Sequence, residues 1–208
     1  MLRAPWLATL TAAALLPLWA YAAAEQRFPS EEGTLVVDTL ADGLRNPWAL
    51  AFLPGGKDML VTERAGNLRL VNAEGKVGPP ISGVPKVWAE GQGGLLDVAL
   101  SPEFGKDRTV YLSYAEEGSD GKAGTAVGRG QLSEDRARLE HFTVIFRQLP
   151  KLSVGNHFGS RLVFDRNGYL FIALGENNQR PTAQDLDKLQ GKVCLLYTSD
   201  AADDSLRV

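Results

Sequence analysis

Cysteine is nearly absent from this sequence, because Cys194 is the only one among 208 residues. One thiol cannot form an intramolecular disulfide, so a small fold held by a disulfide framework is excluded. A long basic stripe is also lacking, and the formal net charge is -3 with a pI near 5.5. Proteins that bind nucleic acid usually carry a clustered positive patch. Nucleic acid is therefore not expected as a partner.

Strong helical patterns are lacking as well. Only residues 182–191, "TAQDLDKLQG", could form one or two helical turns. Hydrophobic residues nevertheless make up 44% of the chain, which is typical of a globular protein and not of a disordered or fibrous one. The sequence therefore points to a fold built mainly from strands.

The first 24 residues have the layout of a secretory signal peptide. A basic start at Arg3 precedes an apolar run that ends in the small-x-small sequence Ala20-Tyr21-Ala22. An uncleaved membrane anchor is the alternative, but Pro17 and the alanine-rich end favour cleavage near Ala22 or Ala24. We expect an exported mature protein without a membrane span, periplasmic if the source is Gram-negative.

The end of the chain has a different character. Residues 194–203, "CLLYTSDAAD", resemble the translation of a transposase adapter used to prepare sequencing libraries. We hypothesise that the natural sequence is interrupted at about Val193 and that residues 194–208 are not native, whereas the alternative is a genuine acidic tail. Residues 25–193 would then be the N-terminal part of a longer protein.

Three segments of the sequence share one pattern, and they begin at Asn46, Gly93 and His157. Each contains a short apolar strand, a turn rich in Pro, Gly or Asp, and a second apolar strand. The first strands are predicted at Leu50–Phe52, Val98–Leu100 and Leu162–Phe164, the second at Met59–Thr62, Val110–Tyr114 and Leu170–Leu174, and a further strand at Asn67–Val71. This spacing is within the range of β-propeller blades, with a β-sandwich as the alternative. We predict an all-β fold, a β-propeller of which about three blades are present.

Propeller geometry singles out two polar residues. The loops that precede the innermost strands converge at one mouth of the central channel, so residues in these loops face a shared pocket. His157 occupies this position in the third repeat and Gln92 in the second, both among glycines. An imidazole can accept a proton near neutral pH, so His157 is a candidate general base, with a structural histidine in the loop before a strand as the alternative.

Four stretches resemble the soluble pyrroloquinoline-quinone (PQQ) sugar dehydrogenases of the glucose/sorbosone dehydrogenase type. They are "RNPWALAFLP", "EGQGGLLDVALSPEF", "GNHFGSRLVFDRNGYLFIALGE" and "RPTAQDLDKLQGKV". The likeness spans Leu35 to Val193 and is strongest to the aldose sugar dehydrogenase branch. It implies a six-bladed propeller that oxidises the anomeric carbon of aldoses to lactones, with PQQ as cofactor and calcium bound.

The resemblance also assigns roles to residues. It implies that His157 is the general base on the C1 hydroxyl, and that Gln92, Asn156 and Gln179 contact the substrate. The PQQ clamp and the calcium ligands are implied to lie beyond Val193, so no cofactor-binding or metal residue is assigned within this chain, and the fragment alone is expected to be inactive. The partners implied are an aldose and an electron acceptor that the sequence does not identify.

The sequence departs from the family pattern at two positions. Ser160 stands where the family usually has glycine, and a serine side chain could crowd the loop that carries His157. Asn156 stands where other members often have aspartate, which removes a charge beside the histidine.

Other polar and aromatic residues receive simpler interpretations. Glu176 is interpreted as a turn residue, with a carboxylate that faces a ligand as the alternative. Arg64 is interpreted as a solvated turn arginine, with an arginine that reaches an anion as the alternative. His141 is interpreted as a surface residue. Trp48 and Trp88 are interpreted as packing residues of the propeller.

Two other functions remain open on the sequence. A propeller lactonase would need several channel-facing oxygen ligands for calcium, and Asn156 and Glu176 alone do not make such a set. A non-enzymatic propeller that binds sugar or protein would keep the blades but would not need a base at the channel mouth.

Overall fold

The computed structural model describes residues 26–153 and 155–196. The predicted signal peptide and residues 197–208 of the predicted non-native tail lie outside the described residues. The chain divides into two compact units, one ending at Thr39 and the other beginning at Leu40, and each is described by itself. In the described part of the chain, no helix has the length and apolar character needed to cross a membrane.

The first unit contains a β-hairpin that the sequence patterns did not predict. Strands β1 (Gln26–Ser30) and β2 (Gly33–Val37) pair antiparallel. The Ser30 hydroxyl donates to the Gly33 carbonyl at 2.6 Å and so closes the tight turn between them. All residues of both strands are exposed within the described structure.

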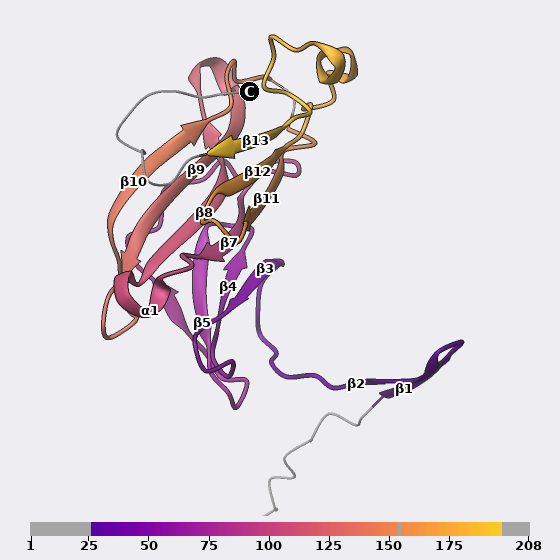
Figure 1. Cartoon of the computed structure of the whole chain (residues 1–208), viewed down its shortest axis with the longest axis vertical. Coiled ribbons are helices and arrows are strands. Elements are labelled where there is room, and N and C mark those ends of the chain that lie inside the picture. Colours follow the sequence, from indigo (N-terminus) through magenta and orange to yellow (C-terminus); the bar gives the residue numbers. More distant parts are fainter. Residues whose placement is uncertain (1–25, 154, 197–208) are drawn as a thin grey trace, which may run out of the picture. The chain divides into compact units, whose positions relative to one another are not determined.

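The second unit contains three antiparallel sheets (Figure 1). The first sheet consists of β3 (Pro47–Phe52), β4 (Met59–Glu63), β5 (Asn67–Val71) and β6 (Val77–Ile81). The second consists of β7 (Leu95–Leu100), β8 (Thr109–Glu117), β9 (Ala123–Leu132) and β10 (Leu139–Arg147). The third consists of β11 (Gly159–Phe164), β12 (Leu170–Leu174) and β13 (Val193–Leu196). Short helical turns occur at α1 (Phe104–Asp107), η1 (Ser119–Gly121) and η2 (Arg180–Gln184).

The predicted strands are confirmed, and the three repeats correspond to the three sheets. The bounds of β5 and β12 are those predicted, and the other five predicted strands lie within longer observed ones. The helical pattern of residues 182–191 yields only the short turn η2. Cys194–Leu196, at the start of the predicted non-native tail, extend β13 and pair with β12. The origin of residues 194–208 stays a prediction.

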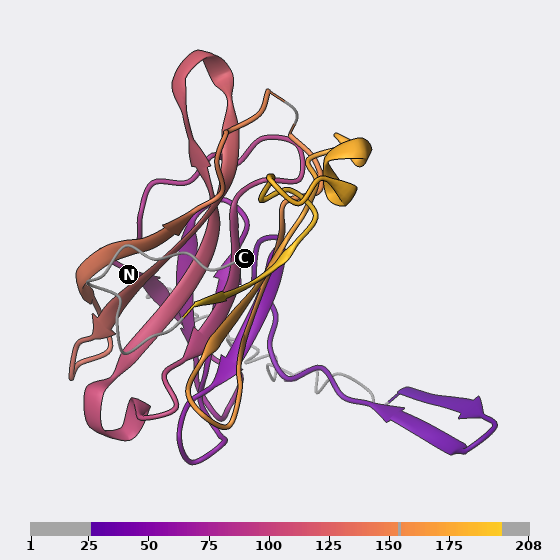
Figure 2. The ribbon, with the colours of Figure 1, turned by 45° about the horizontal axis from the view of Figure 1, so that its top comes forward.

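The sheets are arranged radially, with the first strand of each sheet innermost. Strand β7 contacts both β3 and β11, whereas the later strands of each sheet lie progressively farther out (Figures 1 and 2). Successive side chains of a strand point to opposite faces. On β8, Leu112 therefore packs in the core shared with the first sheet, and Tyr111 packs in the core shared with the third. This is the arrangement of β-propeller blades, as predicted.

Apolar burial and polar contacts both join neighbouring sheets. Each buried leucine or isoleucine contributes about 1.5–3 kcal/mol when it leaves water. The Thr62 hydroxyl donates to the Leu96 carbonyl at 2.7 Å, which ties the first sheet to the second. Asp97 Oδ2 accepts the backbone N–H of Leu162 at 2.7 Å, which ties the second sheet to the third. Burial raises the pKa of the Asp97 carboxyl, although the hydrogen bond from Leu162 opposes this effect.

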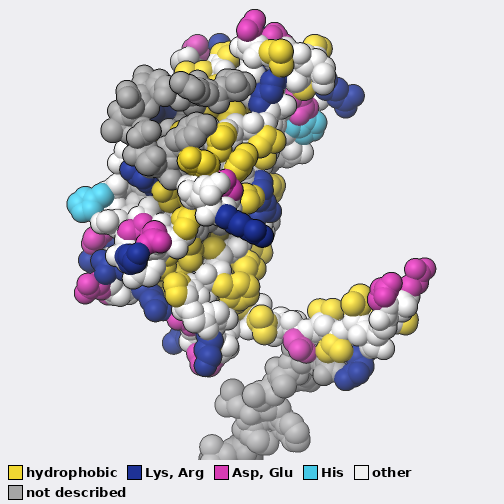
Figure 3. Space-filling model, viewed as in Figure 1, with side chains coloured by type: hydrophobic (Ala, Val, Ile, Leu, Met, Phe, Trp, Pro, Cys, Tyr) yellow, Lys and Arg dark blue, Asp and Glu magenta, His cyan; other side chains and the backbone are white. Residues whose placement is uncertain are grey.

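The two tryptophans interpreted as packing residues behave differently. Trp88 packs against Phe158, with ring centroids 5.9 Å apart, as predicted. The interpretation of Trp48 was wrong for this structure, because 49% of its surface is exposed. It lies with exposed Leu50 and Phe52 on one face of β3, since these residues alternate along the strand. Figure 3 shows hydrophobic side chains gathered on the surface of this unit.

Candidate active site

The loops that lead into β7 and β11 meet at one end of the inner strands. We call residues 91–94 and 155–158 the mouth loops. The Gln92 backbone N–H donates to the Gly155 carbonyl at 2.8 Å. The His157 backbone N–H in turn donates to Gln92 Oε1 at 2.9 Å. The structure thus brings Gln92 and His157, two residues selected from the sequence, into direct contact.

Glu176 lies against the ring of His157. In the β11–β12 hairpin, Gly159 pairs with Leu174, so the residues two positions outside this pair, His157 and Glu176, meet across the hairpin end. Glu176 Oε1 lies 2.5 Å from His157 Nδ1. The Asn177 N–H donates to the His157 carbonyl at 3.2 Å, which extends the pairing beyond the strands.

The contact with Glu176 selects one tautomer of the imidazole. The hydrogen bond with His157 holds the pKa of the Glu176 carboxyl below its usual value, so this group is a carboxylate at neutral pH. A carboxylate only accepts hydrogen bonds, and Nδ1 therefore carries the proton. In the neutral ring Nε2 then has the free lone pair. Nε2 has no hydrogen-bond partner among the described residues, and 40% of the side chain is exposed.

The second sheet supports the backbone around this pair. His157 has a φ of 49°, a left-handed conformation that is uncommon outside glycine and is often found at functional sites. The Thr125 hydroxyl donates to the Phe158 carbonyl at 2.7 Å, and Gln148 Nε2 donates to the Gly175 carbonyl at 2.8 Å. These side chains, from β9 and the segment after β10, fix the two backbone positions next to His157 and Glu176.

Asn156 and Gln179 lie near the pair but do not join its hydrogen bonds. The Asn156 carbonyl accepts from Asn177 Nδ2 at 3.0 Å, and its own carboxamide has no partner in the described structure. Gln179 is exposed, and its backbone N–H donates to the Glu176 carbonyl at 2.8 Å. Their predicted contacts with substrate stay predictions.

Glu176 is a functional candidate for which the sequence interpretation preferred a turn role. Its turn position is confirmed, because it follows β12 directly, but its carboxylate is committed to His157. A signal was available in the hairpin itself. Once Gly159 and Leu174 are recognised as the outer pair, residues at equal distances beyond them are expected to face each other.

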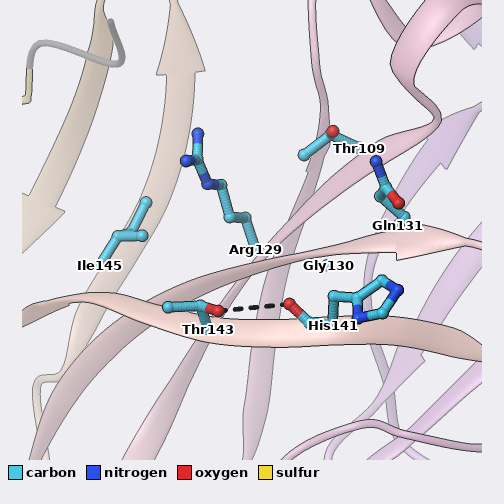
Figure 4. A pocket seen from close by; sticks show the side chains of 7 residues that line it. All are labelled: Thr109, Arg129, Gly130, Gln131, His141, Thr143 and Ile145. Atoms are coloured by element: carbon cyan, nitrogen blue, oxygen red, sulfur yellow. Dashed lines mark hydrogen bonds between the residues drawn. The ribbon is translucent and has the colours of Figure 1, made fainter. Parts of the chain in front are cut away.

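His141 lies in a different place. The chain contains two histidines, and Figure 3 shows them on separate parts of the surface. His141 is exposed on β10, in agreement with its interpretation as a surface residue. It borders an open cavity of about 520 Å³ between the ends of β8, β9 and β10, together with Arg129 and Thr143 (Figure 4). Among the described residues, no acidic side chain lines this cavity, and none pairs with His141 as Glu176 pairs with His157.

The comparison with known proteins identifies the family. The family described as Glucose / Sorbosone dehydrogenase matches residues 44–205. The chain belongs to this family. A curated member, the aldose sugar dehydrogenase YliI of Escherichia coli (strain K12), is 63% identical over 163 residues. The matched region covers 78% of this chain and 44% of that protein, so the chain spans about half the length of the curated relatives it matches.

Solved structures of the family agree with the fold. The apo-form of the soluble aldose sugar dehydrogenase from Escherichia coli superimposes with a TM-score of 0.74 at 64% identity, covering 76% of this chain and 46% of that one. The PQQ-bound aldose sugar dehydrogenase from Streptomyces coelicolor superimposes with a TM-score of 0.70 at 32% identity, covering 79% and 48%. The all-β propeller assignment and the resemblance stated from the sequence are both confirmed.

The described residues fit only part of what the family's cofactor requires. The mouth loops supply an imidazole and carboxamides, which suit sugar hydroxyl groups. PQQ carries three carboxylates, which call for clustered Arg or Lys, and neither mouth loop contains one. Across the described residues, no group of three or more His, Cys, Asp or Glu side chains is placed to hold a metal ion. These side chains can therefore hydrogen-bond to hydroxyl groups, but by themselves they do not fit PQQ or calcium.

Proposed function

We propose that the protein to which this chain belongs oxidises aldoses at the anomeric carbon to lactones, with PQQ as cofactor. One observation carries this proposal: a histidine at the mouth has Nδ1 held by a carboxylate and Nε2 open toward solvent. Membership of a sugar dehydrogenase family supports the same reaction class.

His157 acts as the general base in this proposal. Conversion of a cyclic aldose to a lactone removes a hydride from C1 and a proton from the C1 hydroxyl, and a C1=O double bond forms. Nε2 accepts the proton, and the carboxylate of Glu176 stabilises the resulting imidazolium across Nδ1. The neutral tautomer fixed by Glu176 places the lone pair on the nitrogen that is open to the substrate.

Gln92 has two functions in this proposal. Its Oε1 accepts the His157 N–H, which leaves the Nε2 amide protons free to donate to a sugar hydroxyl. The carboxamides of Asn156 and Gln179 would supply further hydroxyl contacts. Binding and proton removal are thereby coupled, because one glutamine touches both the sugar and the loop of the base.

The cofactor supplies what these residues lack. PQQ, when bound, provides the acceptor for the hydride. The Arg or Lys side chains that bind its carboxylates would come from residues beyond Val193. The ligands of the calcium ion that the family implies would come from the same part of the protein. We also propose export by the signal peptide at residues 1–24, which would place sugar oxidation outside the cytoplasm and leave the electron acceptor to be identified.

Reconstitution with PQQ tests the proposal. The full-length protein is prepared without cofactor, titrated with PQQ in the presence of calcium, and assayed for dye reduction with an aldose. We expect dye reduction that saturates with PQQ, lactone as the product, and loss of turnover in His157→Gln. If the folded full-length protein binds aldoses but reduces no dye at saturating PQQ, a non-enzymatic sugar-binding propeller replaces the dehydrogenase.

A further inference from the structure

Arg64 connects the first sheet to the loop that carries Gln92. It follows β4, and its backbone N–H donates to the Asn46 carbonyl at 3.1 Å, just before β3. Its own carbonyl accepts the N–H of Leu95 at 3.0 Å, at the start of β7. The residue thus joins the starts of two inner strands through its backbone alone.

The side chain of Arg64 reaches the same loop by a separate route. Arg64 Nη1 donates to the Gly91 carbonyl at 2.7 Å, directly before Gln92. The turn position predicted for Arg64 is confirmed, and the prediction did not include this side-chain hydrogen bond. No carboxylate pairs with this guanidinium in the described structure, so its hydrogen bond to Gly91 is the only one its side chain makes there.

Two glycines show how closely the loop is packed at this point. A Cβ at Gly94 would lie 2.1 Å from the Arg64 carbonyl oxygen, and φ at Gly94 is +139°. A Cβ at Gly91 would lie 2.4 Å from the Gly155 carbonyl oxygen, and φ at Gly91 is +54°. Neither distance is possible for a real Cβ atom. The loop is therefore packed between Arg64 on one side and the His157 loop on the other.

We propose that Arg64 is a positioning residue that holds the Gln92 carboxamide against the His157 backbone and so sets affinity for the sugar. The connection runs from Arg64 to the Gly91 carbonyl, through the neighbouring Gln92, to the His157 N–H. In the described structure the guanidinium makes no hydrogen bond to His157 or Glu176. The predicted effect of Arg64 on sugar affinity rests on the proposed function. The contacts from Arg64 through Gln92 to His157 do not, because they are present in the cofactor-free protein.

A double-mutant cycle tests the effect on sugar affinity in the full-length enzyme. Arg64→Met and Gln92→Ala should each raise KM by about tenfold with kcat within about threefold, and the double variant should be no worse than Gln92→Ala alone. Arg64→Lys keeps a donor that can reach the Gly91 carbonyl, so it should restore most of the affinity. The matched control is Arg136→Met, which removes an exposed arginine paired with Asp58 and should leave KM unchanged.

Hydrogen exchange tests the connection without catalysis. The His157 amide should exchange slowly in the cofactor-free protein because it is bonded to Gln92 Oε1, and at least tenfold faster in Arg64→Met and Gln92→Ala. Amides within β8 and the Tm should change little in both variants, which separates positioning from general destabilisation.

Each outcome of the two tests decides the inference. Exchange of the His157 amide in Arg64→Met within twofold of wild type overturns it, whatever the sugar kinetics show. Fully additive KM effects in the double variant also overturn it. If Gln92→Ala leaves KM unchanged, the proposed sugar contact of Gln92 fails, and the exchange rates alone then decide whether Arg64 positions the loop. If Arg64→Met does not fold, Arg64→Gln and Arg64→Lys are compared by the same criteria.

Discussion

Glu176 Oε1 and His157 Nδ1 lie 2.5 Å apart although the two residues are 19 positions apart in the sequence. The β11–β12 hairpin creates this contact, because the two residues flank its outermost pair at equal distances. The pair sits where the mouth loops of two propeller sheets meet. Because of this pairing, experiments on His157 and Glu176 can distinguish a catalytic role of the histidine from a structural one.

Replacement of His157 should abolish most of the turnover of the full-length enzyme and spare its fold. His157→Gln keeps similar bulk but has no basic nitrogen. A positioned general base contributes roughly 10²–10⁴-fold, so kcat should fall by about that factor while the Tm and PQQ affinity barely change. His141→Gln is the matched control and should be near wild type. Near-normal turnover in His157→Gln, accompanied by a lowered Tm, would show that the residue is structural.

Replacement of Glu176 should change the pH dependence of the rate. Glu176→Gln removes the charge that stabilises the imidazolium and weakens the preference for the tautomer with the proton on Nδ1. We expect kcat to fall about 10- to 100-fold, and the acidic limb of the rate profile to move to lower pH. The profile is measured as kcat/KM from pH 5 to 9. An unchanged acidic limb would contradict the pairing of Glu176 with the base.

The Glu176 carboxylate should also make the stability of the folded protein depend on pH under acidic conditions. Its pKa is lowered in the folded protein from the ordinary value of 4.5, with the hydrogen bond to His157 as the main cause. A lowered folded-state pKa gives a stabilisation that is fully present above the unfolded-state pKa and is lost as the pH falls through the folded one. The Tm difference between wild type and Glu176→Gln should therefore be present above the unfolded-state pKa and shrink as the pH falls below it. A difference that persists at pH 2.5 would rule out this origin.

Replacement of Ser160 should stabilise the protein. Ser160 is buried and has a φ of 97°, in the region that glycine adopts without steric cost. This conformation explains why glycine suits the position, and strain of this kind costs about 1–3 kcal/mol. Ser160→Gly should raise the free energy of unfolding by about 1 kcal/mol after the added entropy of the unfolded chain is deducted. Ser113→Gly is the contrasting control, because the Ser113 hydroxyl accepts the Asp97 N–H at 2.9 Å and its loss should destabilise.

The single thiol should report on the pairing of β13. Cys194 is buried in the core of the third sheet, and burial raises the pKa of its thiol. A raised pKa leaves less thiolate, which is the reactive form. Alkylation of this 208-residue chain at pH 8 should therefore be at least about tenfold slower in the folded state than in urea. Equal rates in the two states would show that β13 does not form.

The strands were largely predictable because their signal is local. Asn67–Val71 lies between Gly66 and Asn72, and Leu170–Leu174 is an apolar run that ends before Gly175. The observed strands have the same bounds as the predicted ones. Strand β9 was not predicted, because its sequence "AGTAVGRGQL" has three glycines and few large apolar residues. It forms because β8 and β10 pair with it on both sides, which is a tertiary cause.

The candidate site likewise has features that the local sequence predicts and features that depend on tertiary contacts. By itself the sequence determined that His157 and Gln92 precede inner strands, since the position of a residue relative to a strand is local information. Only the tertiary structure decided that Gln92 Oε1 accepts the His157 N–H and that Glu176 fixes the tautomer of the His157 ring. The same holds for the hydrogen bond from the Arg64 side chain to the Gly91 carbonyl. These contacts join residues from different loops, and a glutamate or arginine in a turn has the same sequence pattern whether or not its side chain finds such a partner. The physical reason is that chain folding brings polar groups together, and the energies that fix their partners depend on distances that no local pattern records.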